Sequence, residues 1–126
     1  MRKMMSAAAA AFATAATAVV AMSGAAQAAP AGDTALWGCP SGAVCIYGEG
    51  VNPALNPHPT NVYYSYGAHN LSNQFGYHVV LNNQYGGASA SLCKNYGGSN
   101  CVWDIPQDYY VNYDLTPINS ITLNRP

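Results

Sequence analysis

Residues 39–47 read Cys-Pro-Ser-Gly-Ala-Val-Cys-Ile-Tyr, and this stretch decides the fold. Two cysteines enclose a Pro-Ser-Gly turn, and the turn leads into the apolar run 43–47, which is typical of a short buried β-strand. A second ring follows downstream, where Cys93 and Cys101 enclose the glycine-containing segment 94–100. Short strands combined with cysteines and turns indicate a small, disulfide-tied β-domain.

The cysteine count predicts two disulfides, because an even number of cysteines in a small exported domain forms a disulfide framework. Four cysteines permit three pairings, and the sequence does not decide among them. Pairing of nearest neighbours gives Cys39–Cys45 and Cys93–Cys101, each worth about 2–2.5 kcal/mol of loop entropy. Zinc ligation is the alternative, but neither cysteine spacing matches the two-residue spacing of a zinc knuckle.

The chain begins with the pattern of a secretory signal peptide, residues 1–28. Two basic residues precede an alanine-rich apolar run, and the segment ends in the cleavage pattern Ala-Gln-Ala. We expect cleavage after Ala28, a loose leader over residues 29–38 and one domain over residues 39–126. A transmembrane anchor is the alternative, but alanine gives little drive for stable insertion. The protein is therefore expected to be secreted and free of the membrane.

The composition of residues 29–126 describes a neutral, turn-rich domain. Its basic residues are Lys94 and Arg125, against five acidic residues, and it holds all ten tyrosines and both tryptophans of the chain. So few basic side chains leave no surface for nucleic acid. Apolar residues nowhere follow a helical period over ten residues, so we expect few helices.

Seven segments have the composition of short strands: 43–47, 61–66, 77–81, 88–93, 101–105, 109–113 and 118–123. The proline-rich segment 51–60 and the polar segment 67–76 are expected to form loops. Residues 44–50 resemble residues 92–98 at an offset of 48, and the same step joins Ser72 to Ser120. Chance is the alternative in a chain rich in Gly and Ser. A duplicated four-strand unit would give an all-β double Greek-key β-sandwich.

Residues 39–47, placed behind a signal peptide, resemble the opening of the secreted peptidase inhibitor family I36. That family is metalloproteinase-inhibitor-like and similar in fold to the βγ-crystallins, with two Greek keys and two short-range disulfides. The resemblance extends to about residue 123, and the segment 96–98, Tyr-Gly-Gly, is similar to the aromatic-x-Gly turn of crystallin motifs. It implies a βγ-crystallin-like fold and a monomeric, secreted inhibitor whose partner is an extracellular protease.

An inhibitor of this kind offers a rigid loop that enters the protease cleft like a substrate. The candidate inhibitory loop is the start of the second cysteine ring: Cys93, Lys94, Asn95 and Tyr96. Thermolysin-like enzymes generally take an apolar side chain in their main pocket, and Tyr96 offers one. The proline-stiffened loop 51–60, with Leu55 at its tip, is the second candidate. The alternative for both is an ordinary structural loop.

Catalysis finds little support in the sequence. The chain lacks the Gly-x-Ser-x-Gly elbow of a serine nucleophile, and its histidines lack zinc-enzyme spacing; they are His58, His69 and His78. Few carboxylates precede Ser72 and Ser120, where a crystallin-type fold would bind calcium. We therefore expect no enzyme, no metal ion and no cofactor.

The alternative function is a non-inhibitory binding module for carbohydrate or a cell-wall polymer. Neutral aromatic surfaces suit sugar rings, and six tyrosines gather in two stretches: Tyr63, Tyr64, Tyr66, Tyr109, Tyr110 and Tyr113. The structural alternative is that these rings pack the sandwich and shield its faces.

Overall fold

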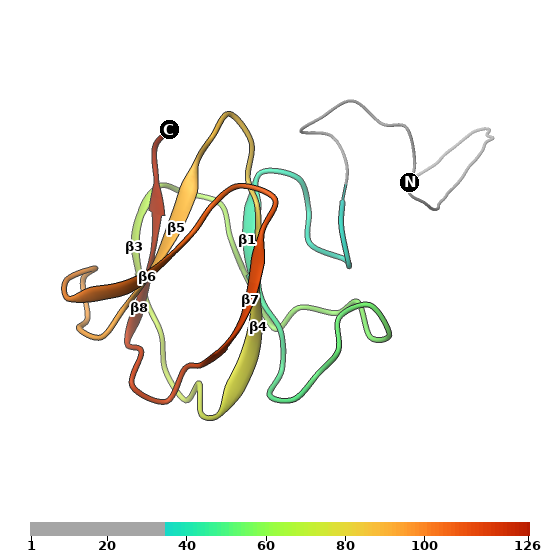
Figure 1. Cartoon of the computed structure of the whole chain (residues 1–126), viewed down its shortest axis with the longest axis horizontal. Helices are drawn as coiled ribbons and strands as arrows, with labels where there is room; N and C mark the ends of the chain where they lie inside the picture. Colours follow the sequence, from blue (N-terminus) through green and yellow to red (C-terminus); the bar gives the residue numbers. More distant parts are fainter. Residues whose placement is uncertain (1–34) are drawn as a thin grey trace. The chain divides into compact units, whose positions relative to one another are not determined.

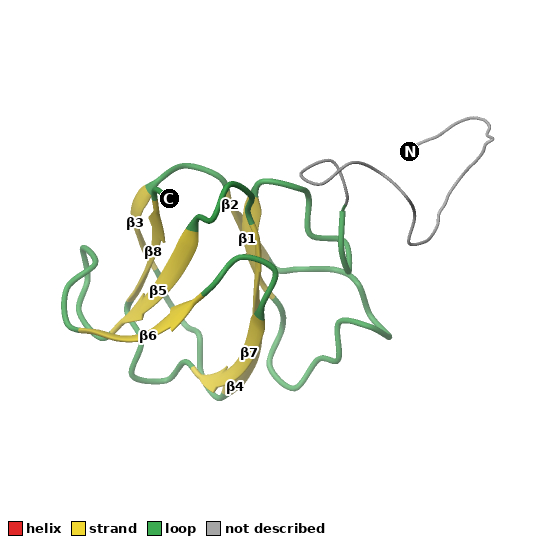
Figure 2. Ribbon diagram, turned by 45° about the horizontal axis from the view of Figure 1, so that its top comes forward, coloured by secondary structure: helices red, strands yellow, loops and turns green. Residues whose placement is uncertain are grey.

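The structure is a computed structural model that describes residues 35–126. The predicted signal peptide and the first part of the predicted leader therefore lie outside the described residues. Every regular element of the described part is a β-strand (Figure 2). The search of these residues for a helix long and apolar enough to cross a membrane finds none. The prediction of an all-β fold is confirmed.

Eight strands form two antiparallel four-stranded sheets. The first sheet has the order β2-β1-β4-β7, built from β1 (Ala43–Ile46), β2 (Asn61–Tyr63), β4 (Tyr77–Asn83) and β7 (Tyr110–Asp114). The second sheet has the order β3-β8-β5-β6, built from β3 (Gly67–Asn70), β5 (Ser89–Cys93), β6 (Cys101–Ile105) and β8 (Ser120–Asn124). Figure 1 shows the two sheets as separate layers.

The two halves of the described chain repeat one strand arrangement. β1, β2 and β4 are neighbours in the first sheet, while β3 crosses to the edge of the second sheet. β5, β6 and β8 are neighbours in the second sheet, while β7 crosses to the edge of the first. Each half therefore completes the sheet of the other half.

The 48-residue offset does not describe this repeat. Ser120 begins β8 and is buried, whereas Ser72 is exposed in the connection between β3 and β4. The connection from β1 to β2 spans residues 47–60, but the equivalent connection from β5 to β6 spans only 94–100. Because the connections differ in length, no single step relates the two halves, and the match at Ser72 was wrong.

The main core lies between the sheets and receives alternate residues of each central strand. β1 contributes Val44 and Ile46, and β5 contributes Ala90 and Leu92; all four are fully buried. The remaining buried members are Leu71, Val80, Ile105, Leu115, Ile118, Ile121 and Leu123. Because side chains alternate along a strand, the intervening residues of β1 and β4 face outward. There they form a second buried cluster, which contains Cys45, Tyr47, Val79 and Leu81.

Both disulfides join nearest neighbours, Cys39–Cys45 and Cys93–Cys101, as predicted. The described part contains no free cysteine. Disulfides persist in oxidising compartments, so the two bonds are consistent with an extracellular protein.

Two segments are more ordered than the sequence indicated. Gly67–Asn70, predicted as loop, forms β3, because its backbone pairs with β8 from Gly67↔Leu123 to Asn70↔Ser120. This edge strand is polar and mostly exposed, so it lacks the apolar alternation by which strands are recognised. Residues 35–38, assigned to the loose leader, lead into a tight turn in which Leu36 and Cys39 exchange backbone hydrogen bonds of 3.0 and 2.8 Å.

Asn82 is a fully buried polar residue that connects the two sheets. It lies on β4 of the first sheet, and its Nδ2 donates to the carbonyl oxygens of Ala88 and of Ile105, at 3.0 and 2.9 Å. Ile105 ends β6 of the second sheet. The Oδ1 atom of Asn82 accepts from the backbone N–H and from Nε2 of Gln84. The buried carboxamide is therefore fully paired, which removes the cost of burying it.

We predict that Asn82→Leu lowers the free energy of unfolding by about 2–4 kcal/mol, because two buried carbonyls lose their donor. Urea unfolding with both disulfides intact measures the change. Asn56→Leu, in an exposed loop, is the control and should stay within about 0.5 kcal/mol of wild type. An Asn82→Leu protein as stable as wild type would show that this carboxamide does not hold the sheets together.

Candidate functional site

The second disulfide closes a hairpin, residues 93–101, that connects β5 with β6. Cys93 and Cys101 are register partners across these strands. The arms of the 93–101 hairpin are also joined by two backbone hydrogen bonds, from Lys94 N–H to the Asn100 carbonyl at 2.9 Å and from Asn95 N–H to the Ser99 carbonyl at 3.2 Å. The candidate inhibitory loop is thus cross-linked at its base and hydrogen-bonded above it.

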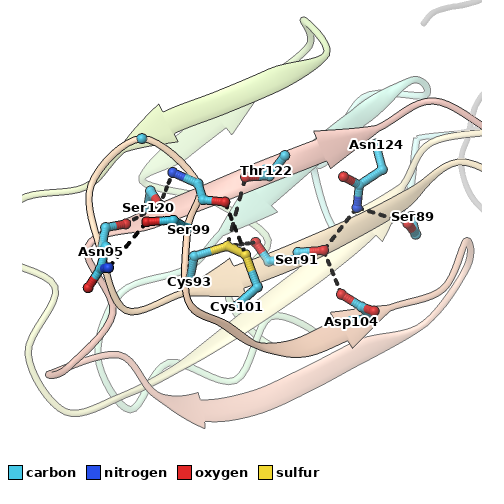
Figure 3. The surroundings of a disulfide bond; sticks show 12 residues. Ser89, Ser91, Cys93, Asn95, Ser99, Cys101, Asp104, Ser120, Thr122 and Asn124 are labelled. Carbon is cyan, nitrogen blue, oxygen red and sulfur yellow. Dashed lines mark hydrogen bonds between the residues drawn. A yellow bond between two sulfur atoms is a disulfide. The ribbon is translucent and has the colours of Figure 1, made fainter.

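Ser120 holds this hairpin against the second sheet. Its hydroxyl donates to the carbonyl oxygen of Asn95 at 2.6 Å and accepts from the N–H of Gly98 at 3.0 Å. Figure 3 shows Ser120 and Asn95 gathered beside the disulfide. A Cβ at Gly98 would lie 2.7 Å from Oγ1 of Thr122 and 3.0 Å from Cβ of Ala68, and φ is +83° there. Only glycine therefore lets the hairpin fold this closely onto the sheet.

Two asparagines outside the hairpin fix two further backbone groups within it. Nδ2 of Asn119 donates to the carbonyl oxygen of Lys94 at 2.8 Å, and Oδ1 of Asn70 accepts from the N–H of Gly97 at 2.8 Å. Asn70 belongs to β3 and Asn119 immediately precedes β8, so both neighbouring strands contribute. The hairpin backbone is consequently ordered before any partner binds.

The side chains of the candidate inhibitory loop differ in exposure. Cys93 is buried, whereas Lys94, Asn95 and Tyr96 are exposed, and the Tyr96 side chain is 61% exposed. The structure therefore places three of the four predicted residues together on a stiff, accessible turn. Their inhibitory role stays a prediction.

The proline-rich loop 51–60 is folded back onto the turn at residues 36–39. A Cβ at Gly38 would lie 2.0 Å from the carbonyl oxygen of Pro57, so the two segments touch through their backbones. Oδ1 of Asn52 accepts from the N–H of Ala54 at 3.0 Å and closes a tight turn within the loop. Leu55 is 83% exposed. This loop also offers an apolar side chain on a supported backbone.

The six tyrosines do not form one surface. Tyr63 and Tyr113 are partly buried and pack against the main core. The Tyr66 ring lies 4.6 Å from the Arg125 guanidinium, in a cation–π contact. Tyr110 meets Trp37 edge to face instead, with ring centroids 5.1 Å apart. Strand pairing thus separates residues that are neighbours in sequence.

A cavity of about 440 Å³ lies over the outer face of the first sheet. We call it the Trp37 groove; it is lined by Trp37, Tyr77, Val79, Tyr110, Asn112 and the loop 50–54. Of the tyrosines that the sequence singled out, Tyr110 lines it. Sequence reasoning missed Trp37 and Tyr77, because these aromatic residues are isolated in the sequence and only the fold brings them to Tyr110.

Trp37 is held in an unusual backbone conformation. Its φ is +51°, followed by +73° at Gly38, so both central residues of the turn are left-handed, as in a type I′ turn. The hydroxyl of buried Tyr47 donates to the Trp37 carbonyl oxygen at 2.7 Å. Burial raises the pKa of Tyr47 to about 12. Tyr47 is therefore a neutral donor that supports the turn.

The histidines have separate structural partners. The two ring nitrogens of His78 lie 2.7 Å from the Tyr47 carbonyl oxygen and 2.9 Å from that of Phe75. Nε2 of His69 lies 2.7 Å from the Ser65 carbonyl oxygen. Among residues 35–126, no group of three or more His, Cys, Asp or Glu side chains is arranged to hold a metal ion.

Comparison with protein-family models, curated proteins and solved structures finds no match to the chain. Two surface features of the described part remain to indicate a function, the 93–101 hairpin and the Trp37 groove.

We predict that Ser120→Ala speeds hydrogen exchange at the Gly98 amide by about tenfold or more, because the acceptor of that N–H is lost. Exchange followed by NMR measures the effect. Ser72→Ala removes an exposed hydroxyl that makes no hydrogen bond to the hairpin and should leave the Gly98 rate unchanged. If the Gly98 amide exchanged at the same rate in Ser120→Ala and Ser72→Ala, Ser120 would not anchor the hairpin.

We predict an alkaline loss of stability that depends on Tyr47. Its folded pKa, about 12, lies above the ordinary value of 10.0, so its contribution is complete below pH 10 and is lost as pH rises from 10 to 12. Tyr47→Phe should be about 1 kcal/mol less stable at pH 8, since one hydrogen bond is lost. Its free energy of unfolding should fall less than that of wild type between pH 10 and 12. If the free energies of unfolding of wild type and Tyr47→Phe fell by the same amount between pH 10 and 12, Tyr47 would not be the source of the alkaline loss.

Proposed function

We propose that the protein is a secreted inhibitor of an extracellular protease, of the metalloprotease class, and that it acts by binding without catalysis. The observation that carries this proposal is the 93–101 hairpin, an exposed turn braced by a disulfide and by side chains of two neighbouring strands. The resemblance of residues 39–47 to peptidase inhibitor family I36 supports the same function.

We also propose that the two sheets form a double Greek-key, βγ-crystallin-like sandwich. The strand order supports this, because each half keeps three strands in one sheet and sends its third strand to the other. The segment 96–98, which the resemblance likens to the aromatic-x-Gly turn of crystallin motifs, is held to the second sheet by the hydrogen bond from the Gly98 N–H to the Ser120 hydroxyl.

The braced backbone explains how such a hairpin inhibits a protease. The carbonyl oxygens of Lys94 and Asn95 are held by Asn119 and Ser120, so the ordering cost of binding is met when the protein folds. A peptide bond cut within the hairpin would leave both pieces joined by the disulfide, and the ends would remain in place. Tyr96 projects the large apolar ring that fits the main pocket of a thermolysin-like enzyme.

We predict that the full chain, with both disulfides formed, inhibits a thermolysin-like metalloprotease at micromolar concentration or below. Tyr96→Ala should raise the inhibition constant about thirtyfold, as for a hot-spot ring worth about 2 kcal/mol. Tyr64, which is 60% exposed, gives the matched control Tyr64→Ala, which should inhibit like wild type. Hydrolysis of a fluorogenic peptide measures inhibition.

The same assay with a subtilisin-like serine protease tests the class of the target. Leu55→Ala tests the second loop: a loss of inhibition in this variant, with Tyr96→Ala unaffected, moves the site to the loop 51–60. Absence of inhibition in both protease classes at about 10 μM protein, a concentration well above the proposed affinity, would overturn the proposed function.

A further inference from the structure

We propose that the Trp37 groove binds a neutral sugar unit of an oligosaccharide or polysaccharide. This site would serve a function separate from protease inhibition. It lies on the outer face of the first sheet, whereas the 93–101 hairpin belongs to the second sheet. Its cavity of about 440 Å³ is within the size range of small-molecule sites.

The floor of the groove is fixed by strand register. Val79 on β4 is the register partner of Asn112 on β7. Tyr77 and Tyr110 lie two residues away along the same strands, so they share the outer face with Val79 and Asn112. The turn at residues 36–39 and the loop 51–60 lie beside this face in Figure 1, in cyan and green. Four separate parts of the chain therefore meet at one site.

Exposed aromatic rings dominate the walls. Tyr77 is 57% exposed and Tyr110 is 55% exposed, and Trp37 stands edge to face with Tyr110 at an interplanar angle of 70°. A pyranose ring carries C–H groups on its faces and hydroxyl groups on its rim. An aromatic face covers the C–H groups, while neighbouring polar groups reach the hydroxyl groups.

The polar groups of the groove are neutral. None of its lining residues is acidic, basic or histidine, so an anionic or cationic ligand would lose water without gaining a counter-charge. The carboxamides of Asn52 and Asn112 supply donors and acceptors that suit hydroxyl or acetamido groups. A purely apolar ligand would desolvate the Asn112 carboxamide and the Nδ2 group of Asn52 without offering either a hydrogen-bond partner. The chemistry therefore favours a neutral sugar over an apolar peptide.

The groove is built before a ligand arrives. A left-handed backbone is unfavourable for a bulky residue such as Trp37, and strained residues of this kind gather at functional sites. Three constraints maintain the left-handed conformation of Trp37: the Leu36–Cys39 hydrogen bonds, the hydrogen bond from the Tyr47 hydroxyl to the Trp37 carbonyl oxygen, and the Cys39–Cys45 disulfide. The loop 51–60, whose first residues line the groove, is packed against Gly38 through Pro57. A preformed aromatic site loses little conformational entropy on binding.

The test is titration of the full, disulfide-bonded chain with triacetylchitotriose and, separately, with cellotriose. The two sugars distinguish acetamido-bearing from plain glucose units. Trp103→Phe keeps Trp37 as the only indole and should show a saturable change in tryptophan emission as sugar is added. Trp37→Phe keeps Trp103 and should show no such change.

By calorimetry, Tyr110→Ala should weaken sugar binding about tenfold or more, as expected for loss of one aromatic ring. Tyr109→Ala, its sequence neighbour, which is 63% exposed, should bind within about twofold of wild type.

Several results would overturn the site. One is the absence of binding of either sugar to the wild-type protein at sugar concentrations up to about 10 mM. A specific site of this size would bind with a dissociation constant below that concentration. A second is equal weakening by Tyr110→Ala and Tyr109→Ala, which would place binding elsewhere. A third is capture of an apolar peptide, measured in the same titration, without any sugar binding. Urea unfolding of each variant confirms its fold, and Trp103→Phe keeps the test valid if Trp37→Phe fails to fold. Protease inhibition is measured independently, so either proposal stands or fails alone.

Discussion

The exchange of the third strand between the two halves is the constraint on which the rest of this structure depends. β3 completes the sheet of the second half, and β7 completes the sheet of the first. Without its partner, each half would keep a three-stranded sheet whose apolar face has no covering sheet. Too little apolar surface would then be buried, so neither half is expected to fold by itself. The core residues of β1 and β5 are covered only when both sheets are complete, and Asn82 reinforces this dependence with a polar contact across the sheets.

Each disulfide serves a different surface. The Cys93–Cys101 bond closes the hairpin on the second sheet, and the Cys39–Cys45 bond fixes the turn that carries Trp37 over the first sheet. Both bonds span short loops, so each contributes only about 2–2.5 kcal/mol through loop entropy. Their larger effect is local, because each one orders an exposed segment that the main core does not reach. A small domain can in this way support two rigid surface features.

The sequence predicted the features that neighbouring residues specify. It did not predict the features that depend on pairing between strands far apart in the sequence. Strand 101–105 and both disulfides could be predicted, since their signals lie within a few neighbouring residues. β3 could not, because a polar edge strand is specified by its partner β8. The Trp37 groove could not be assembled either, since its residues come from four distant segments. In the tyrosine stretches, Tyr63 and Tyr113 pack against the main core, as the structural alternative predicted, because neighbours on a strand point to opposite faces.

Lys94 is the only lysine among residues 29–126, and it is exposed on the 93–101 hairpin. If the chain is cut after Ala28, the mature protein carries two primary amines, the α-amino group and this side chain. The exposed lysine therefore offers a chemical handle for attaching a fluorophore or a solid support at the hairpin, because none of the residues that line the Trp37 groove carries a side-chain amine.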